Sequence, residues 1–162
     1  MSEKTTLTLK NNETVTLRWA EPADAGAIVK LELESALYEN RAEPITISEF
    51  EFTKYWEERL KGDNYKTVLV CGANRIYGFL TFVNEIKLGK VLALYIDPSY
   101  MRLGIGSNLM RIAEQMVSLK GGKTIEVEVE TKNRGGLIFY ENLGLKRVGY
   151  INDHLIKMIK EL

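Results

Sequence analysis

A glycine turn between an apolar strand and an amphipathic helix constrains the fold of this chain most strongly. The stretch Lys90–Ile96 is rich in apolar residues and is closed by Pro98, which cannot donate a hydrogen bond to a sheet. Gly104 and Gly106 follow, and apolar residues recur at helical spacing over Ile105–Leu119. Such a turn directs unpaired backbone N–H groups and the positive end of a helix dipole toward one point, which suits a phosphate group.

The remaining sequence alternates between strand and helix patterns. Ser48, followed three residues later by Glu51, has the pattern of a capping box at a helix start. No linker, repeat or low-complexity tract interrupts the chain, so we expect one domain over residues 1–162. Outside the glycine turn, we predict strands at 14–18, 67–71, 76–83, 124–130, 145–150 and 154–160, and helices at 25–39, 48–60 and 134–142.

Composition argues against several classes of protein. The 162 residues include 22 basic and 22 acidic side chains, so no global field attracts nucleic acid or a membrane surface. Cys71 is the single cysteine and His154 the single histidine, which argues against a disulfide framework and against a metal site. No run approaches the roughly 20 apolar residues of a membrane span, and the first residues lack an apolar signal segment. We therefore expect a cytoplasmic location.

The residues of the glycine turn leave its role open. A nucleotide P-loop is excluded, because its spacing and its lysine are missing. A dinucleotide-binding turn needs a third small residue where Leu109 stands, although Glu126, about 20 residues after Gly106, imitates the acidic ribose ligand. In the simplest interpretation, Gly104 and Gly106 only form a tight turn.

A second segment narrows these alternatives. Asn133 lies seven residues before Tyr140, and the predicted helix ends at Gly144. Together the two segments resemble the GNAT superfamily of acyl-CoA-dependent N-acetyltransferases. The glycine turn is similar to its pyrophosphate motif, (Q/R)xxGx(G/A), and the second segment is similar to its N-x-x-(A/G)-x-x-x-Tyr-x-x-x-Gly-(F/L) stretch. Met101 stands where the motif has Gln or Arg, and the arginine is displaced to Arg102.

The resemblance covers about residues 14 to 160 and implies an α/β (α+β) fold. The expected fold is a mixed, mostly antiparallel sheet of about seven strands, flanked by about four helices, with two strands splayed for the cofactor. The implied co-substrate is acetyl-CoA, without a metal. The resemblance also implies the cofactor-binding residues. Main-chain groups of Leu94 and Ile96 would bind the acetyl carbonyl and the pantetheine arm, Asn133 would contact the same arm, and Tyr140 would lie beside the sulfur. The pyrophosphate would be bound by the residues of the turn, which are Met101, Arg102, Leu103, Gly104, Ile105, Gly106 and Ser107.

The resemblance also implies a catalytic role for Tyr140. A phenol, with a reference pKa of about 10, can protonate the departing thiolate. Alternatively, Tyr140 only packs with its aromatic neighbour, and Asn133 serves mainly as the N-cap of its helix. The general base stays open, since Glu85, Tyr95, Glu128 or a chain of waters could accept the proton of the amine.

Acceptor recognition in this family usually comes from the first two helices, their loop and the last hairpin. Here that region includes Tyr38, Arg41, Glu43 and Glu49–Trp56. Acidic Glu34, Glu39 and Glu43 would suit a cationic amine, although they also fit a solvated helix face. We expect Trp56 in the core, and Cys71 and His154 in structural roles.

The leading hypothesis is an N-acetyltransferase that moves an acetyl group from acetyl-CoA to a primary amine of a small molecule or peptide by direct transfer. The alternative is a non-catalytic acyl-CoA-binding sensor or interaction module with the same fold. A small nucleotide-binding α/β domain is a third hypothesis. The resemblance also brings the expectation of a homodimer.

Overall fold

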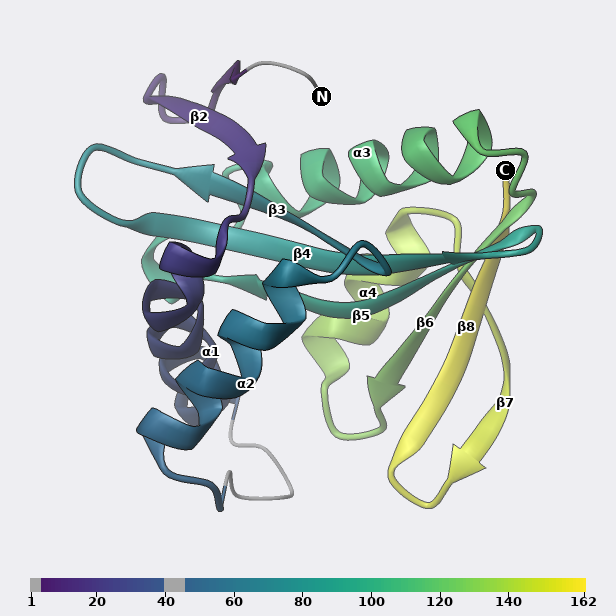
Figure 1. The fold of residues 1–162 in the computed structure, drawn as a ribbon. Helices are drawn as coiled ribbons and strands as arrows, with labels where there is room; N and C mark the ends of the chain where they lie inside the picture. Colours follow the sequence, from purple (N-terminus) through teal and green to yellow (C-terminus); the bar gives the residue numbers. More distant parts are fainter. Residues whose placement is uncertain (1–3, 40–45) are drawn as a thin grey trace. The chain divides into compact units, whose positions relative to one another are not determined.

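The computed structural model describes residues 4–39 and 46–162. These residues form eight strands, four α-helices and two short 3-10 helices. The strands belong to one sheet in the order β1-β2-β3-β4-β5-β6-β8-β7 (Figure 1). The chain divides into two compact units, each described by itself below. The first unit contains the described residues up to Thr81 together with Ala93–Leu109, and the second contains Phe82–Leu92 and Met110–Leu162.

The strands confirm a mixed, mostly antiparallel sheet and add one strand to the expected seven. The predicted strands of the first half correspond to β2 (Thr14–Trp19), β3 (Tyr65–Cys71), β4 (Ile76–Glu85) and β5 (Leu88–Ile96). The extra strand is β1 (Thr5–Thr8), which pairs antiparallel with β2 from Thr5↔Leu17 to Thr8↔Thr14. Three of its four residues are threonine, so β1 lacks the apolar alternation that identifies a strand in sequence.

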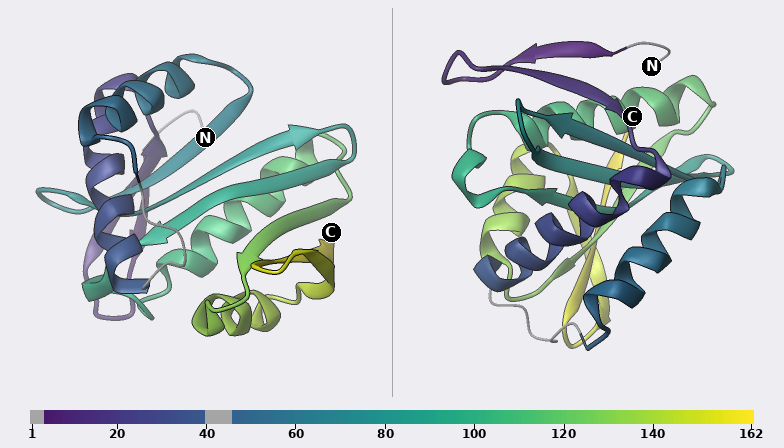
Figure 2. Two further views of the ribbon diagram at one scale, coloured as in Figure 1. Left: turned by 90° about the horizontal axis from the view of Figure 1, so that it is seen from below. Right: turned by 60° about the vertical axis from the view of Figure 1, so that its left-hand side comes forward.

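Two helices of the first unit match the predicted ranges closely. They are α1 (Ala25–Glu39) and α2 (Glu49–Lys61), which pack against each other (Figure 2). The capping box is confirmed, because the Ser48 side chain accepts a hydrogen bond from the Glu51 N–H and the Glu51 side chain accepts one from the Ser48 N–H. Trp56 is 2% exposed, as expected for the core, and its indole N–H donates to Glu32 Oε2 at 3.2 Å.

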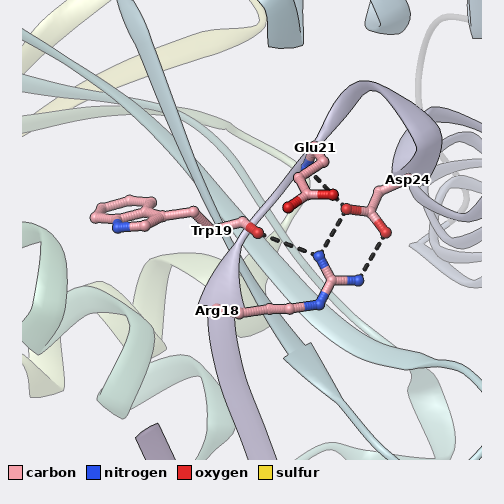
Figure 3. A network of polar contacts seen from close by, with 4 residues as sticks. All are labelled: Arg18, Trp19, Glu21 and Asp24. Atoms are coloured by element: carbon pink, nitrogen blue, oxygen red, sulfur yellow. Dashed lines mark hydrogen bonds and ion pairs between the residues drawn. The ribbon is translucent and has the colours of Figure 1, made fainter. Parts of the chain in front are cut away.

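An ion pair fixes the entry into α1. Arg18, on β2, makes two parallel hydrogen bonds of 2.7 Å to the carboxylate of Asp24, in the short helix Pro22–Asp24 (Figure 3). Asp24 also accepts a hydrogen bond from the Glu21 N–H at 2.8 Å. These bonds hold the Asp24 pKa below its usual value, the largest cause being the hydrogen bond from Arg18. The turn from strand to helix is therefore held by charge as well as by packing.

The second unit contains the strands β6 (Thr124–Glu130), β7 (Lys146–Asn152) and β8 (Leu155–Glu161). β6 pairs in parallel with the beginning of β5, from Leu88↔Thr124 to Val91↔Val127, and antiparallel with β8. β7 pairs with β8 at the edge of the sheet, where all seven of its residues are exposed and the register shifts twice. Both hairpin strands begin one residue later than predicted.

Two further helices complete the predicted set of four, at α3 (Ile105–Leu119) and α4 (Arg134–Asn142). Within the second unit, Gly89 faces Val117 of α3, and a Cβ at Gly89 would lie 2.1 Å from a Val117 methyl group. The absence of a side chain at Gly89 lets the helix lie close to β5. The glycine turn and α3 thus stand where the sequence predicts them, while the single-domain organisation of residues 1–162 stays a prediction.

Candidate functional site

The predicted phosphate-binding turn lies in the first unit and has an unusual backbone. It follows the short helix η2 (Pro98–Tyr100), and two of its residues have positive φ, Arg102 at 63° and Gly104 at 93°. A φ of 93° strains any residue with a Cβ, so glycine is required at position 104. Alternation of this kind between left-handed and other conformations makes concave sites that bind anions through backbone N–H groups.

The start of α3 supplies those N–H groups. The Gly104 carbonyl accepts the first helical bond, from the Asn108 N–H at 3.1 Å, and a second bond from the Asn108 side chain at 2.9 Å. The N–H groups of Ile105, Gly106 and Ser107 precede this bond and therefore have no partner within the helix. Ile105 is 1% exposed, which anchors the helix start, whereas Arg102 and Ser107 are exposed. The arrangement fits a phosphate group.

Leu94 and Ile96 lie on β5 beyond its parallel register with β6, which ends at Val91. Both side chains are half-buried. The Ile96 carbonyl accepts a long hydrogen bond of 3.4 Å from the Ser35 hydroxyl of α1. Their proposed contacts with a cofactor stay predictions.

In the second unit, Asn133 directly precedes α4 and Tyr140 lies within it. Asn133 is the N-cap, and its side-chain oxygen accepts a hydrogen bond from the Gly136 N–H at 2.8 Å, which confirms the capping role. A Cβ at Gly136 would lie 2.8 Å from the Asn133 amide nitrogen, so the residue that closes this cap must be small. Tyr140 is 8% exposed, and its ring meets Phe139 edge to face at 5.1 Å.

The three candidate bases have different surroundings. Tyr95 is 7% exposed and packs against Phe79 in the core of the first unit. Glu128 accepts a 2.5 Å hydrogen bond from Lys90, and this bond is the main cause that raises the Lys90 pKa. The Glu128 carboxylate is thus already paired with an ammonium group. Glu85, at the end of β4, is exposed.

The residue that imitates a ribose ligand has partners of its own. Glu126 is 5% exposed, and its carboxylate lies 3.2 Å from Lys157 Nζ and 3.8 Å from Lys90 Nζ. The buried Glu126 carboxylate forms ion pairs with lysines on the two neighbouring strands, β5 and β8, which compensates for its burial. This pairing removes the acidic ligand on which the dinucleotide interpretation depended.

The predicted acceptor region lies partly outside the residues that the structure describes. Arg41 and Glu43 fall outside the described residues, as does the side chain of Glu39. Glu34 and Tyr38 are exposed on α1. Part of the predicted acceptor segment Glu49–Trp56 lines a shallow depression beside α2. At this depression, the Arg59 guanidinium donates a hydrogen bond to the Tyr55 hydroxyl at 3.1 Å. The side chains lining this depression are Glu51, Lys54, Tyr55, Glu58, Arg59 and Tyr65.

Cys71 and His154 show no sign of a catalytic arrangement. Cys71 is half-buried at the end of β3, and burial raises the pKa of its thiol, which disfavours a reactive thiolate. His154 is exposed, and its backbone N–H donates to the Asn152 side chain at 2.8 Å.

Over residues 4–39 and 46–162, no cluster of His, Cys, Asp and Glu side chains could hold a metal ion. In the same residues, no helix has the length and apolar character needed to cross a membrane.

Sequence reasoning missed the residues that pack against the segment leading into the phosphate-binding turn. Asp97, directly after β5, is 3% exposed and pairs with Arg75 from the turn between β3 and β4. Tyr77 of β4 and Tyr100 of η2 stack with ring centroids 3.6 Å apart. A sequence signal exists only for Asp97, because Asp before Pro is a frequent start of a turn.

Comparison by sequence relates the chain to acetyltransferases. The profile of a family described as the acetyltransferase (GNAT) domain matches residues 37–154. An uncharacterised N-acetyltransferase of Methanocaldococcus jannaschii is 23% identical over 94 residues, which are 58% of this chain and 39% of that protein. The match with this curated relative thus spans about two fifths of the relative's length.

Comparison by structure gives the same picture of the fold. The PaiA N-acetyltransferase of Thermoplasma acidophilum, solved in complex with coenzyme A, matches with a TM-score of 0.74 and 19% identity, covering 91% of this chain and 99% of that chain. The GNAT domain of S. lividans PAT matches with a TM-score of 0.81 and 12% identity, covering 98% of this chain and 97% of that chain. At these identities, the likeness establishes a shared fold.

Proposed function

Because the chain belongs to the GNAT acetyltransferase family, we propose that it transfers an acetyl group from acetyl-CoA to a primary amine of a small molecule or peptide. The observation that carries this proposal is the turn before α3, where Gly104 has a φ of 93° and the N–H groups of Ile105, Gly106 and Ser107 have no helical partner. The solved complex of the Thermoplasma relative with coenzyme A supports the choice of ligand.

In the proposed complex, the pyrophosphate lies at Met101–Ser107, where backbone N–H groups and the helix dipole favour negative charge. Main-chain groups of Leu94 and Ile96 hold the acetyl carbonyl and the pantetheine arm. Asn133 contributes to the same arm while it caps α4. Since most of the pyrophosphate contacts come from the backbone, Met101 in place of Gln or Arg is compatible with binding.

The proposed reaction is a direct transfer without a covalent enzyme intermediate. The amine nitrogen attacks the carbonyl carbon of the thioester, the new C–N bond forms, and the C–S bond breaks. The thiolate that leaves takes its proton from the Tyr140 hydroxyl. The proton lost by the amine passes to water, since Glu128 is paired with Lys90, Tyr95 is packed in the core, and Glu85 lies at the hairpin end of β4, away from the end of β5 that carries Leu94 and Ile96.

The first test is acetyl-CoA binding by calorimetry, with a glycine variant at the turn. We expect the wild-type protein to bind acetyl-CoA in preference to NAD and ATP, and Gly104→Val to lose binding by more than about tenfold, because a β-branched residue resists positive φ. Gly121→Val is the matched control, since Gly121 also has positive φ, at 82°, and a Cβ there meets nothing within 4 Å.

The outcome separates the hypotheses. Equal acetyl-CoA binding by the Gly104→Val variant and the wild-type protein would remove the turn from the binding site. Preference for NAD or ATP would favour the nucleotide-binding domain. If acetyl-CoA binds but no amine in a panel of polyamines, lysine peptides and aminoglycosides releases free CoA thiol, the protein is the acyl-CoA-binding sensor.

Two expectations accompany the proposed function. We propose that the protein acts in the cytoplasm and that it forms a homodimer. Fractionation of cells that express the chain from its own gene tests the location. Light scattering coupled to size-exclusion chromatography measures the mass in solution, and a mass near 18.5 kDa would reject the dimer.

A further inference from the structure

Asp97, the residue that directly follows β5, makes four polar contacts. The Asp97 carboxylate accepts a hydrogen bond from the Ser99 N–H at 2.9 Å and pairs with Arg75 Nη2 at 2.9 Å. The Asp97 N–H donates to the Tyr77 carbonyl at 2.8 Å, and the Asp97 carbonyl accepts from the Tyr100 N–H at 2.8 Å. The path of the chain from β5 into the phosphate-binding turn is therefore fixed at its first residue.

Aromatic rings hold the next residues. The ring of Tyr100 stacks on that of Tyr77 at 3.6 Å with an angle of 14° between the ring planes. The Arg75 guanidinium lies 5.9 Å from the centroid of the Tyr77 ring and 5.7 Å from that of Tyr100. A Cβ at Gly72 would lie 2.0 Å from the Tyr77 ring, so the turn between β3 and β4 approaches this stack closely.

The loop between β1 and β2 supports the same turn from a second direction. The Tyr77 hydroxyl donates to Glu13 at 2.7 Å. In the same loop, the Lys10 N–H donates to the Leu103 carbonyl at 3.2 Å, inside the phosphate-binding turn. Two loops that lie far apart in the sequence thus converge on the segment from Asp97 to Leu103.

The backbone of the turn explains why such support is needed. Arg102 has a φ of 63°, a conformation that residues with a Cβ rarely adopt, and Gly104 follows with 93°. Backbone conformations of this kind persist only where the surrounding structure holds them in place. A ligand that binds through backbone N–H groups benefits when these groups already point toward it before binding.

We propose that Arg75 and Asp97 are positioning residues that hold the phosphate-binding turn in its binding conformation. With Tyr77, Tyr100 and Glu13 they form what we call the brace. Arg75 acts on the turn through Asp97 and does not touch the ligand. This inference rests on the proposed function for its effect on acetyl-CoA, whereas its effect on the turn itself can be measured without a ligand.

Arg75 is the residue to change, because its side chain is 55% exposed and its loss leaves the core intact, whereas Asp97 is buried. We expect Arg75→Ala to weaken acetyl-CoA binding by about tenfold, since the buried carboxylate loses its charged partner. We also expect faster hydrogen exchange at the amides of Ser99, Tyr100 and Asn108, and a lower melting temperature, because the buried carboxylate is left without its charged partner. Arg75→Lys keeps the charge and should restore part of these effects.

The matched control is Lys61→Ala, which removes a similarly exposed cation from an ion pair on α2, 2.6 Å from Glu58. The control should bind acetyl-CoA and exchange at the turn like the wild-type protein. Unchanged binding and unchanged exchange in Arg75→Ala would overturn the brace, as would a lower melting temperature with normal binding. If the wild-type protein binds no acetyl-CoA, the proposed function fails, and exchange at the turn alone then supports or rejects the brace.

Discussion

Tyr140 combines two properties at the scale of a single residue, a buried ring and a hydroxyl that we propose as the proton donor. We expect Tyr140→Phe to lower kcat by about a hundredfold, because general acid catalysis contributes on that order. The KM for acetyl-CoA should stay near the wild-type value, since the ring and its contact with Phe139 remain. Steady-state rates of thiol release, with the acceptor that the amine panel identifies, measure both constants.

The control for this variant is Tyr150→Phe, which removes a hydroxyl from a side chain that is 76% exposed on β7. It should leave both constants unchanged. A Tyr140→Phe enzyme with normal kcat would show that Tyr140 only packs, and the proton of the thiolate would then come from water.

The connection between β2 and α1 illustrates how charge contributes at the scale of elements. The Asp24 carboxylate is ionised in its pair with Arg18, and its pKa lies below the usual value of 3.8. The stabilisation is therefore present above pH 3.8 and is lost as the pH falls through the lowered pKa. We expect Asp24→Asn to reduce the free energy of unfolding at pH 7 by about 1 kcal/mol, allowing for partial exposure.

Urea unfolding measures the difference in the free energy of unfolding between the wild-type protein and the Asp24→Asn variant. Repeating it at a series of pH values from 7 to 2.5 checks both the sign and the size of this difference. The difference in free energy should shrink once the pH drops below 3.8. Asp153→Asn, in the exposed turn after β7, serves as the control for an Asp-to-Asn change outside this ion pair. A difference between wild type and Asp24→Asn that stays constant down to the lowest pH would show that the charge of Asp24 is not its source.

At the scale of the whole molecule, the balance of charges sets the behaviour in solution. With 22 basic and 22 acidic side chains, the protein carries a formal net charge of zero at pH 7. Molecules without net charge repel one another least, so we expect solubility to be lowest near pH 7 and to rise toward pH 9. The concentration that remains after centrifugation at a series of pH values measures this, and a maximum at pH 7 would contradict it.

Most elements of the fold can be predicted from sequence, because their signals are local. The capping box at Ser48 and the periodic apolar residues of Ile105–Leu119 each depend on residues within a few turns of one another. β1 cannot be predicted from local patterns, since Thr5–Thr8 form a strand only by pairing with β2. The bounds of β7 shifted for a similar reason, since they depend on the pairing with β8.

The candidate site divides in the same way. The glycine turn and Asn133 can be recognised from spacing, because backbone conformation and capping are properties of a short segment. The pairing of Arg75 with Asp97 and the stacking of Tyr77 on Tyr100 cannot, since each joins residues that only the sheet brings together. For the same reason, the sequence does not reveal that the carboxylates of Glu126 and Glu128 are already paired with lysines.

The two register shifts in β7 bear on how this sheet meets other protein chains. An edge strand offers a row of backbone groups onto which a foreign strand can add, and growth by such addition leads to aggregates. In β7 the register is interrupted between Arg147 and Gly149 and again between Tyr150 and Asn152. A strand arriving from another molecule therefore finds no continuous template. The irregularity of β7 therefore disfavours the addition of a foreign strand at this edge of the sheet.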